Sequence, residues 1–288
     1  MKAQLIDGKR ISAEIKAEAA EEAAALKAKG ITPCLAVVLV GDDSASQVYV
    51  NNKKKACEAV GIRSVSHVLS GGTTEEALLE LIAKLNADKD IHGILVQMPV
   101  PKQIDERKVI LAIDPKKDVD CFHPVNVGNL HTGGEGFLPC TPAGIIELIK
   151  RSGHSIEGKQ CVVIGRSNIV GKPVAMLLMQ ENGTVTICHS KTRNLAEICR
   201  GADIIVSAVG KVNTVTADMV KEGAILIDVG MNRNEAGKLC GDVDFDAISS
   251  VAACATPVPG GIGNVTTAVL ARRLVNAALA QEEAGSEK

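Results

Sequence analysis

Residues 161–174 read CVVIGRSNIVGKPV, and this stretch decides how the second half of the chain folds. An apolar, β-branched run ends at Gly165, and Pro173 opens a further apolar stretch. Proline suits the first turn of a helix, because its missing N–H would be unpaired there and its φ is already helical. The order strand, glycine turn and helix N-terminus predicts an anion site, because free backbone N–H groups and the helix dipole both point at the turn.

Two common glycine motifs do not fit this turn. The dinucleotide pattern G-x-G-x-x-G needs a second glycine where Ser167 stands. The P-loop needs four residues between its glycines and then Lys-Ser/Thr, but five residues separate Gly165 from Gly171, and Pro173 takes the hydroxyl position. These mismatches argue against nucleoside triphosphate hydrolysis. An ordinary strand–helix turn remains the alternative to an anion site.

The next predicted strand, 184–188, indicates which nucleotide the turn binds. An NAD site has an acidic residue near the end of this strand to hold the ribose hydroxyls, whereas an NADP site has cations and hydroxyls there. Here the strand is followed by His-Ser-Lys-Thr-Arg, which includes Ser190, and Arg166 is available from the first turn. The sequence therefore predicts an NADP-binding domain. In the alternative interpretation Arg166 is a solvated loop residue and Ser190 caps the strand.

The composition is that of an ordinary soluble globular protein, with 46% apolar and 23% charged residues among 288. A net charge of −2 gives no electrostatic reason to expect nucleic acid or an anionic membrane as partner. Nine cysteines form no Cys-x-x-Cys pair, and no histidine stands at zinc-like spacing. We therefore predict small buried thiols and no metal. No signal peptide or membrane span is apparent, which predicts a cytoplasmic protein.

Strand and helix patterns alternate along the chain. In the first half they predict strands at 34–40, 63–69 and 92–98 and helices at 11–29, 44–60 and 77–86. Beyond a helix at 142–151, they predict strands at 162–165, 184–188, 203–209 and 224–229 and a last helix at 266–280, with a frayed tail from Gln281. Residues 113–140 show almost no periodicity and are expected to form a long functional loop.

This alternation predicts an α/β protein of two α/β domains with a cleft between them, the second a Rossmann-like, doubly wound parallel sheet. We expect residues 1–141 and 267–288 to form the first domain, and residues 142–266 to form the second.

The predicted helix at 44–60 carries a candidate acid or base. Ser46, Tyr49 and Lys53 are three and then four residues apart, so they lie on one stripe of the helix. A lysine in a partly closed apolar cleft loses its proton more readily and can exchange protons near neutrality. A solvated basic face, which explains most lysine triplets, is the alternative, although it does not explain the tyrosine on the same stripe.

Three more stretches follow predicted strands or loops where ligands of parallel sheets bind. They are Gln97 with Pro99, the segment DVDCFHP at 118–124, and the Pro-Gly-Gly loop at 259–261. The two aspartates of the second stretch could suggest calcium, but the glycine and distal glutamate of an EF-hand loop are missing.

Taken together, these motifs resemble the bifunctional methylenetetrahydrofolate dehydrogenase/methenyltetrahydrofolate cyclohydrolase family over almost the whole chain. The matching segments stand in family order: YVxxK at 49–53, GILVQxP at 93–99, KDVDxFHP at 117–124, PCTP at 139–142, GRSxIVGKP at 165–173 and TPVPGG at 256–261. The resemblance implies hydride transfer from methylenetetrahydrofolate to NADP, followed by hydrolysis of the methenyl product to formyltetrahydrofolate. It also implies a homodimer whose last helix packs on the first domain.

The resemblance implies the following residue roles. Lys53 is the acid/base of the hydrolysis, positioned by Gln97 and Tyr49, and Asp120 hydrogen-bonds the pterin ring. The residues implied to bind the folate are Ser46, Tyr49, Pro99, Asp120, Gly260 and Gly261, and those implied to bind NADP are Thr141, Gly165, Arg166, Ser167, Val170, Gly171 and Ser190.

The chain departs from the family pattern at four places. Cys121 replaces a glycine, Asn129 an arginine, Val212-Asn213 a Pro-Gly pair, and Asn264-Val265 a Pro-Met pair. Altered substrate affinity or a weakened cyclohydrolase activity is therefore one alternative. A two-domain NADP-dependent dehydrogenase of another small substrate, such as an amino-acid or shikimate-type enzyme, and a non-catalytic NADP-binding scaffold are the others. The other dehydrogenase would not need Tyr49, Lys53, Gln97 and Asp120 together. The scaffold would tolerate loss of Lys53, yet Lys53 is present.

Overall fold

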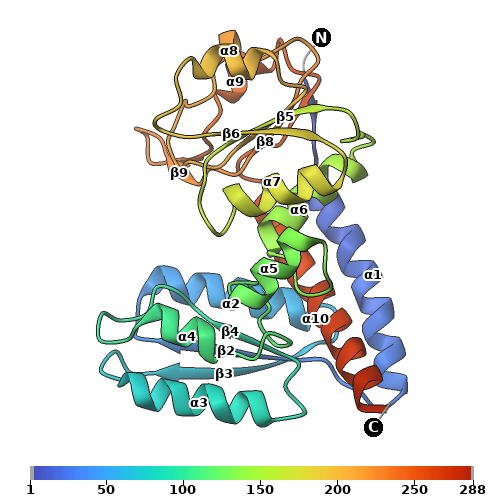
Figure 1. Ribbon diagram of the computed structural model, residues 1–288, viewed down its shortest axis with the longest axis vertical. Helices are drawn as coiled ribbons and strands as arrows, with labels where there is room; N and C mark the ends of the chain where they lie inside the picture. Colours follow the sequence, from blue (N-terminus) through green and yellow to red (C-terminus); the bar gives the residue numbers. More distant parts are fainter. Residues whose placement is uncertain (1–2, 287–288) are drawn as a thin grey trace. The chain divides into compact units, whose positions relative to one another are not determined.

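The computed structural model describes residues 3–286, which form two compact α/β units (Figure 1). The six-stranded unit comprises the chain up to Ser12 and Thr141–Thr266. The three-stranded unit comprises Ala13–Cys140 and the chain from Thr267 onward. Their boundaries fall within helices α1 (Gly8–Ala28), α6 (Cys140–Arg151) and α10 (Ile262–Ser286). The predicted α/β class with two domains is confirmed.

The six-stranded unit contains a fully parallel sheet in the order β1-β11-β8-β7-β5-β6. Its strands are β1 (Gln4–Leu5), β5 (Gln160–Ile164), β6 (Thr184–Cys188), β7 (Ile204–Ser207), β8 (Ile225–Asp228) and β11 (Cys254–Ala255). The domain boundaries expected from the sequence place residues 1–12 in the first domain. Gln4 instead pairs with Cys254 in the six-stranded sheet. A two-residue strand has no periodic pattern, so this long-range pairing could not be predicted from the local sequence.

Helices cover both faces of this sheet, as a doubly wound fold requires (Figure 1). Helix α8 (Leu195–Arg200), the 3-10 helix η1 (Ala217–Met219) and α9 (Phe245–Ile248) share one core with inward residues of the central strands. Helix α7 (Gly171–Gln180) packs on β5 and β6 from the other face, where α6 (Cys140–Arg151) also lies. A separate antiparallel hairpin joins β9 (Asn232–Arg233) and β10 (Leu239–Cys240).

The three-stranded unit is built on β2 (Cys34–Val40), flanked in parallel by β3 (Arg63–Leu69) and β4 (Gly93–Val96). The other helices are α2 (Ser44–Glu58), α3 (Glu75–Ala87), α4 (Glu106–Ala112) and α5 (Pro124–Thr132). Helices α3 and α4 cover one face of the sheet, and α10 approaches the other so closely that a Cβ on Gly93 would overlap Leu274. All seven residues of β2 are buried, which confirms the prediction from its continuous apolar run.

The prediction of a long loop at 113–140 was wrong, because it contains α5. The side chain of His123 caps this helix by accepting from the N–H of Val125 at 3.2 Å, and Gly133 ends it at φ 73°. Its polar and glycine residues hide the helical period. Helix α4 was not predicted either.

Helix α10 runs past the predicted end at residue 280 and reaches Ser286. The amide nitrogen of Gln281 donates to the carbonyls of His92 and Lys116, so tertiary contacts hold a segment that its composition alone would leave frayed. Within residues 3–286, no helix is long and apolar enough to cross a membrane.

Candidate active site

Lys53 and Asp120 form an ion pair in the three-stranded unit. The Nζ of Lys53, on α2, lies 3.5 Å from Oδ1 of Asp120, and each side chain is 20% exposed. Two residues that the sequence proposed separately, 67 positions apart, therefore meet at one partly shielded place. An ammonium beside a carboxylate in a site open to solvent can exchange protons and orient a polar ligand.

The buried Asp118 shapes the turn that carries Asp120. Its carboxylate accepts from the N–H groups of Phe122 at 3.2 Å and His123 at 2.8 Å, and from the amide of Asn126 at 3.0 Å. Burial raises the pKa of this carboxyl above its usual value, although these donors oppose the shift. From the sequence, Asp118 belongs to the predicted ligand-binding stretch 118–124, but this structural role was not predicted. An aspartate just before a run of turn residues is the signal for such a loop-closing role.

Gln97 follows β4 and offers an unused acceptor. Its Nε2 donates to the Met98 carbonyl at 2.8 Å, while its Oε1 is buried and has no hydrogen-bond donor among the described residues. A buried acceptor without a partner costs about 1–3 kcal/mol, and such a group is explained when a ligand supplies the donor. Pro99 lies two residues further on and is exposed.

The other two residues of the predicted stripe differ in exposure. Ser46 is buried, at 8%, and its backbone N–H donates to the carboxylate of Asp43, which caps α2 at 2.7 Å. Tyr49, one turn further along, is 48% exposed. The stripe therefore runs from the interior at Ser46 to solvent at Tyr49, and Lys53 lies at intermediate depth.

Cys121, where the family has glycine, is held in a left-handed conformation at φ 60°. Its buried Sγ donates to the carbonyl of Phe137 at 3.1 Å. Burial raises the pKa of Cys121, and that of its neighbours Cys57 and Cys140, to about 12. These thiols are protonated at neutral pH and act as small apolar side chains, as the sequence predicted.

We expect Cys121→Gly to be about 1 kcal/mol more stable than Cys121→Ala, because a left-handed residue with a Cβ costs roughly 1–2 kcal/mol and glycine carries no such cost. Both variants lose the thiol contact, so the comparison isolates the backbone. Urea midpoints of the two variants measure the difference. A more stable alanine variant would show that strain at this position is negligible.

In the six-stranded unit, the turn after β5 is as tight as its glycines suggest. Gly165 has φ 129°, and a Cβ there would lie 2.5 Å from the carbonyl oxygen of Ala208. A Cβ on Gly171 would overlap the carbonyl of Gly165. The backbone is therefore closely folded where a nucleotide would approach.

Two N–H groups at the start of α7 are satisfied within the turn. The Oγ of Ser167 accepts from Val170 and from Gly171, each at 3.2 Å. These two N–H groups therefore already have an acceptor within the turn, the hydroxyl of Ser167. The roles of Ser167, Val170 and Gly171 toward a cofactor stay predictions, as parts of a shaped turn.

Exposed cations and a hydroxyl stand beside this turn. The N–H of Gly165 donates to the carbonyl of Cys188 at 2.9 Å, which joins the ends of β5 and β6. Arg166 follows the first strand, and Ser190 and Lys191 follow the second, all three exposed. No acidic residue occurs in 189–193. These groups suit a 2′-phosphate on the ribose.

The remaining predicted site residues also belong to the six-stranded unit. Thr141 lies in the first turn of α6, and its hydroxyl is 3.1 Å from that of Thr266. Gly260, at φ 116°, and Gly261 follow β11, and a Cβ on Gly261 would lie 2.7 Å from the Pro257 carbonyl. Gly260 is therefore favoured by its positive φ, and Gly261 by the close approach of the Pro257 backbone. Their contact with a folate stays a prediction.

The Asn129 departure has a visible side-chain role, whereas the contact at Asn264 is made by the backbone. The side-chain amide of Asn129 donates to the carbonyl of Glu135 at 2.6 Å, which closes the loop after α5. Asn264 lies in the first turn of α10, where its carbonyl accepts from the hydroxyl of Ser12 at 3.0 Å.

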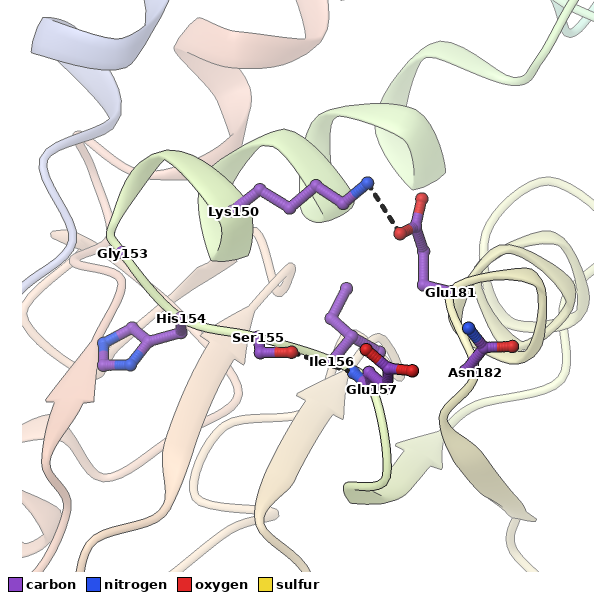
Figure 2. Close-up of a pocket in the computed structure, with 8 residues that line it drawn as sticks. All are labelled: Lys150, Gly153, His154, Ser155, Ile156, Glu157, Glu181 and Asn182. Atoms are coloured by element: carbon purple, nitrogen blue, oxygen red, sulfur yellow. Dashed lines mark hydrogen bonds and ion pairs between the residues drawn. The ribbon is translucent and has the colours of Figure 1, made fainter.

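A surface hollow of about 500 Å³ lies near the amino ends of β5 and β6 in the six-stranded sheet (Figure 2). Lys150 and Glu181 pair across it at 2.6 Å, and Ile156 and Asn182 line it just before β5 and β6. Parallel sheets bind their ligands at the carboxyl ends of the strands, so this hollow at the amino ends is not the candidate site. Among the described residues, no group of three metal-ligating side chains could hold a metal ion.

Comparison with known proteins identifies both parts of the chain. Residues 6–120 match the model of the tetrahydrofolate dehydrogenase/cyclohydrolase catalytic domain, and residues 139–282 match that of the NAD(P)-binding domain of the same family. The bifunctional protein FolD of Agathobacter rectalis is 59% identical over 96% of this chain and 99% of its own.

Solved structures agree with these matches. The bifunctional FolD enzyme of Campylobacter jejuni, a methylenetetrahydrofolate dehydrogenase/cyclohydrolase, superimposes with a TM-score of 0.94 at 50% identity, over 96% of this chain and 99% of its own. The Trypanosoma brucei dehydrogenase-cyclohydrolase, solved with NADP cofactor and an inhibitor, has a TM-score of 0.90 at 40% identity over 100% of both chains. The chain therefore belongs to the tetrahydrofolate dehydrogenase/cyclohydrolase family.

Proposed function

We propose that the three-stranded unit carries the proton chemistry on the folate and that the six-stranded unit holds NADP. The chain is a bifunctional enzyme that oxidises methylenetetrahydrofolate to methenyltetrahydrofolate and hydrolyses the product to formyltetrahydrofolate. The observation that carries the residue assignment is the Lys53–Asp120 pair at 3.5 Å. The resemblance assigns two further residues, Tyr49 and Gln97, to the same chemistry.

The hydrolysis needs a group that moves protons. Water adds to the methenyl carbon and must lose a proton, and the ring nitrogen whose bond to that carbon breaks must gain one. Lys53 takes up the first proton and returns one to the nitrogen. The unpaired Oε1 of Gln97 accepts a hydrogen bond from the ammonium or from the water, and Asp120 accepts from N–H groups of the pterin. Positioned acid/base groups of this kind speed such steps about 10²–10⁴-fold.

The oxidation uses the second unit. Bound NADP supplies the acceptor for the hydride that leaves the methylene carbon. The tight turn at Gly165 and the cations around it support binding of the phosphates, and the lack of an acid at 189–193 supports NADP over NAD. To test both activities, we would mix the protein with methylenetetrahydrofolate and NADP or NAD and follow the methenyl absorbance. An inactive protein with both cofactors would contradict the proposal.

Arg166→Ala is expected to weaken NADP use about ten- to a hundredfold in kcat/KM, because a charged hydrogen bond to phosphate contributes roughly 1.5–3 kcal/mol. NAD lacks this phosphate, so its turnover should hardly change. Arg200→Ala is the matched control, since this exposed arginine on α8 donates to the carbonyl of Asp218 at 3.1 Å, at a place away from the turn after β5. An equal loss with both cofactors would mean that Arg166 shapes the turn and does not contact the phosphate.

We also propose that the enzyme is a cytoplasmic homodimer. The resemblance supports the dimer. The nine free cysteines, eight of them buried, support a reducing compartment. Light scattering coupled to gel filtration would measure the mass, and a monomer at micromolar concentration would contradict the assembly.

A further inference from the structure

Asp242 is a fully buried carboxylate that accepts five hydrogen bonds within the six-stranded unit. Three come from consecutive backbone N–H groups, those of Val209 at 2.8 Å, Gly210 at 3.3 Å and Lys211 at 2.9 Å. The others come from the hydroxyl of Ser207 at 3.1 Å and the amide of Asn232 at 2.9 Å. Consecutive N–H groups that converge in this way form an anion-binding nest, and here the chain's own carboxylate fills it.

A second buried aspartate, Asp228, holds the backbone of Asp242 in place. The carboxylate of Asp228, at the end of β8, accepts from the N–H groups of Asp242, Val243 and Gly230, each at 2.9 Å. The backbone packs so closely around these two carboxylates that the neighbouring glycines have no room for a side chain. A Cβ on Gly230 would overlap the carboxylate of Asp242, and one on Gly241 would overlap that of Asp228. Asp242 therefore sits in a rigid, close-packed support.

The segment that Asp242 holds lies beside the turn proposed to bind NADP. The N–H of Ala208 donates to the carbonyl of Ile164 at 2.8 Å, and Gly165 packs against the carbonyl of Ala208. The next three residues, 209–211, are exposed. They follow β7 at the carboxyl edge of the sheet, where doubly wound folds bind their nucleotide.

We infer that Asp242 is a positioning residue for NADP. Its hydrogen bonds fix the backbone of residues 209–211 in the conformation that contacts the cofactor. Its carboxylate also occupies their N–H groups, so that these groups do not bind phosphate and the phosphates of NADP bind at the turn after β5. The inference rests on the proposed binding of NADP by this unit. Asp242 was not predicted from the sequence, because an aspartate that follows a short hairpin has no local pattern that indicates this role.

Asp242→Asn tests this inference with little change of volume. Oδ2 accepts three of the five bonds and Oδ1 two, so the new NH₂ group faces at least two donors in either orientation. We expect the dissociation constant of NADP, measured by calorimetry, to rise about tenfold or more, with a matching rise in the KM for NADP. Hydrolysis of added methenyltetrahydrofolate, which uses no NADP, should remain normal.

Asp203→Asn is the matched control. Asp203 precedes the other end of the same strand, where it accepts from Lys221 and from the N–H of Gln160, and this variant should bind NADP as the wild type does. Wild-type NADP affinity in a folded Asp242→Asn variant would overturn the inference. If that variant does not fold, Ser207→Ala removes one donor without adding one, and an unchanged KM for NADP there would overturn it equally. Failure of the wild type itself to bind NADP would instead contradict the proposed function.

Discussion

Lys53→Met is expected to abolish the hydrolysis of methenyltetrahydrofolate while hydride transfer to NADP stays measurable. Methionine keeps most of the length of the side chain but can neither take up nor release a proton, so the loss should reach about 10²–10⁴-fold. The oxidation has no step in which Lys53 must accept a proton. In one reaction mixture, NADPH should form while the methenyl absorbance accumulates and does not decay.

Lys55→Met is the matched control for this result. Lys55 lies on the same helix and is exposed, turned about 200° from Lys53 at 3.6 residues per turn. It should leave both activities near those of the wild type. Normal cyclohydrolase turnover in Lys53→Met would contradict the proposed role of Lys53 as the acid/base of the hydrolysis.

Asp120→Ala should reduce both activities together. If its carboxylate accepts from N–H groups of the pterin, each lost charged bond costs roughly 1.5–3 kcal/mol, or about ten- to a hundredfold. Both reactions use the same bound folate, so both lose the same binding energy. Steady-state kcat/KM values for the oxidation and for the hydrolysis measure the two effects.

The ion pair makes the comparison of these variants informative. Asp120 lies 3.5 Å from the Nζ of Lys53, so an alternative role for Asp120 is to position that lysine without touching the pterin. In that case Asp120→Ala would imitate Lys53→Met, with the hydrolysis lost and the oxidation retained. That outcome would contradict direct recognition of the pterin and make Asp120 a positioning residue for Lys53.

Local patterns in the sequence determined the main elements. The apolar run of β2 matches a strand buried on both faces, because both faces of its sheet are covered. Thr74 caps α3 by accepting from the N–H of Ala77 at 3.2 Å, a position that suits a threonine side chain. The motif residues Lys53 and Asp120 were also identified from the sequence, and the doubly wound sheet follows from the alternation of strands and helices.

Only the tertiary structure decided which distant groups meet. The pairing of β1 with β11, the contact of Lys53 with Asp120 and the last turns of α10 depend on residues far apart in the chain, which leave no period in the local sequence. Helix α5 was missed because its stability comes from the His123 cap and from packing, and not from an apolar stripe. The capped N–H groups at Ser167 and the filled nest at Asp242 show the same principle. A sequence states which donors and acceptors exist, but the fold decides whether a ligand or the chain itself uses them.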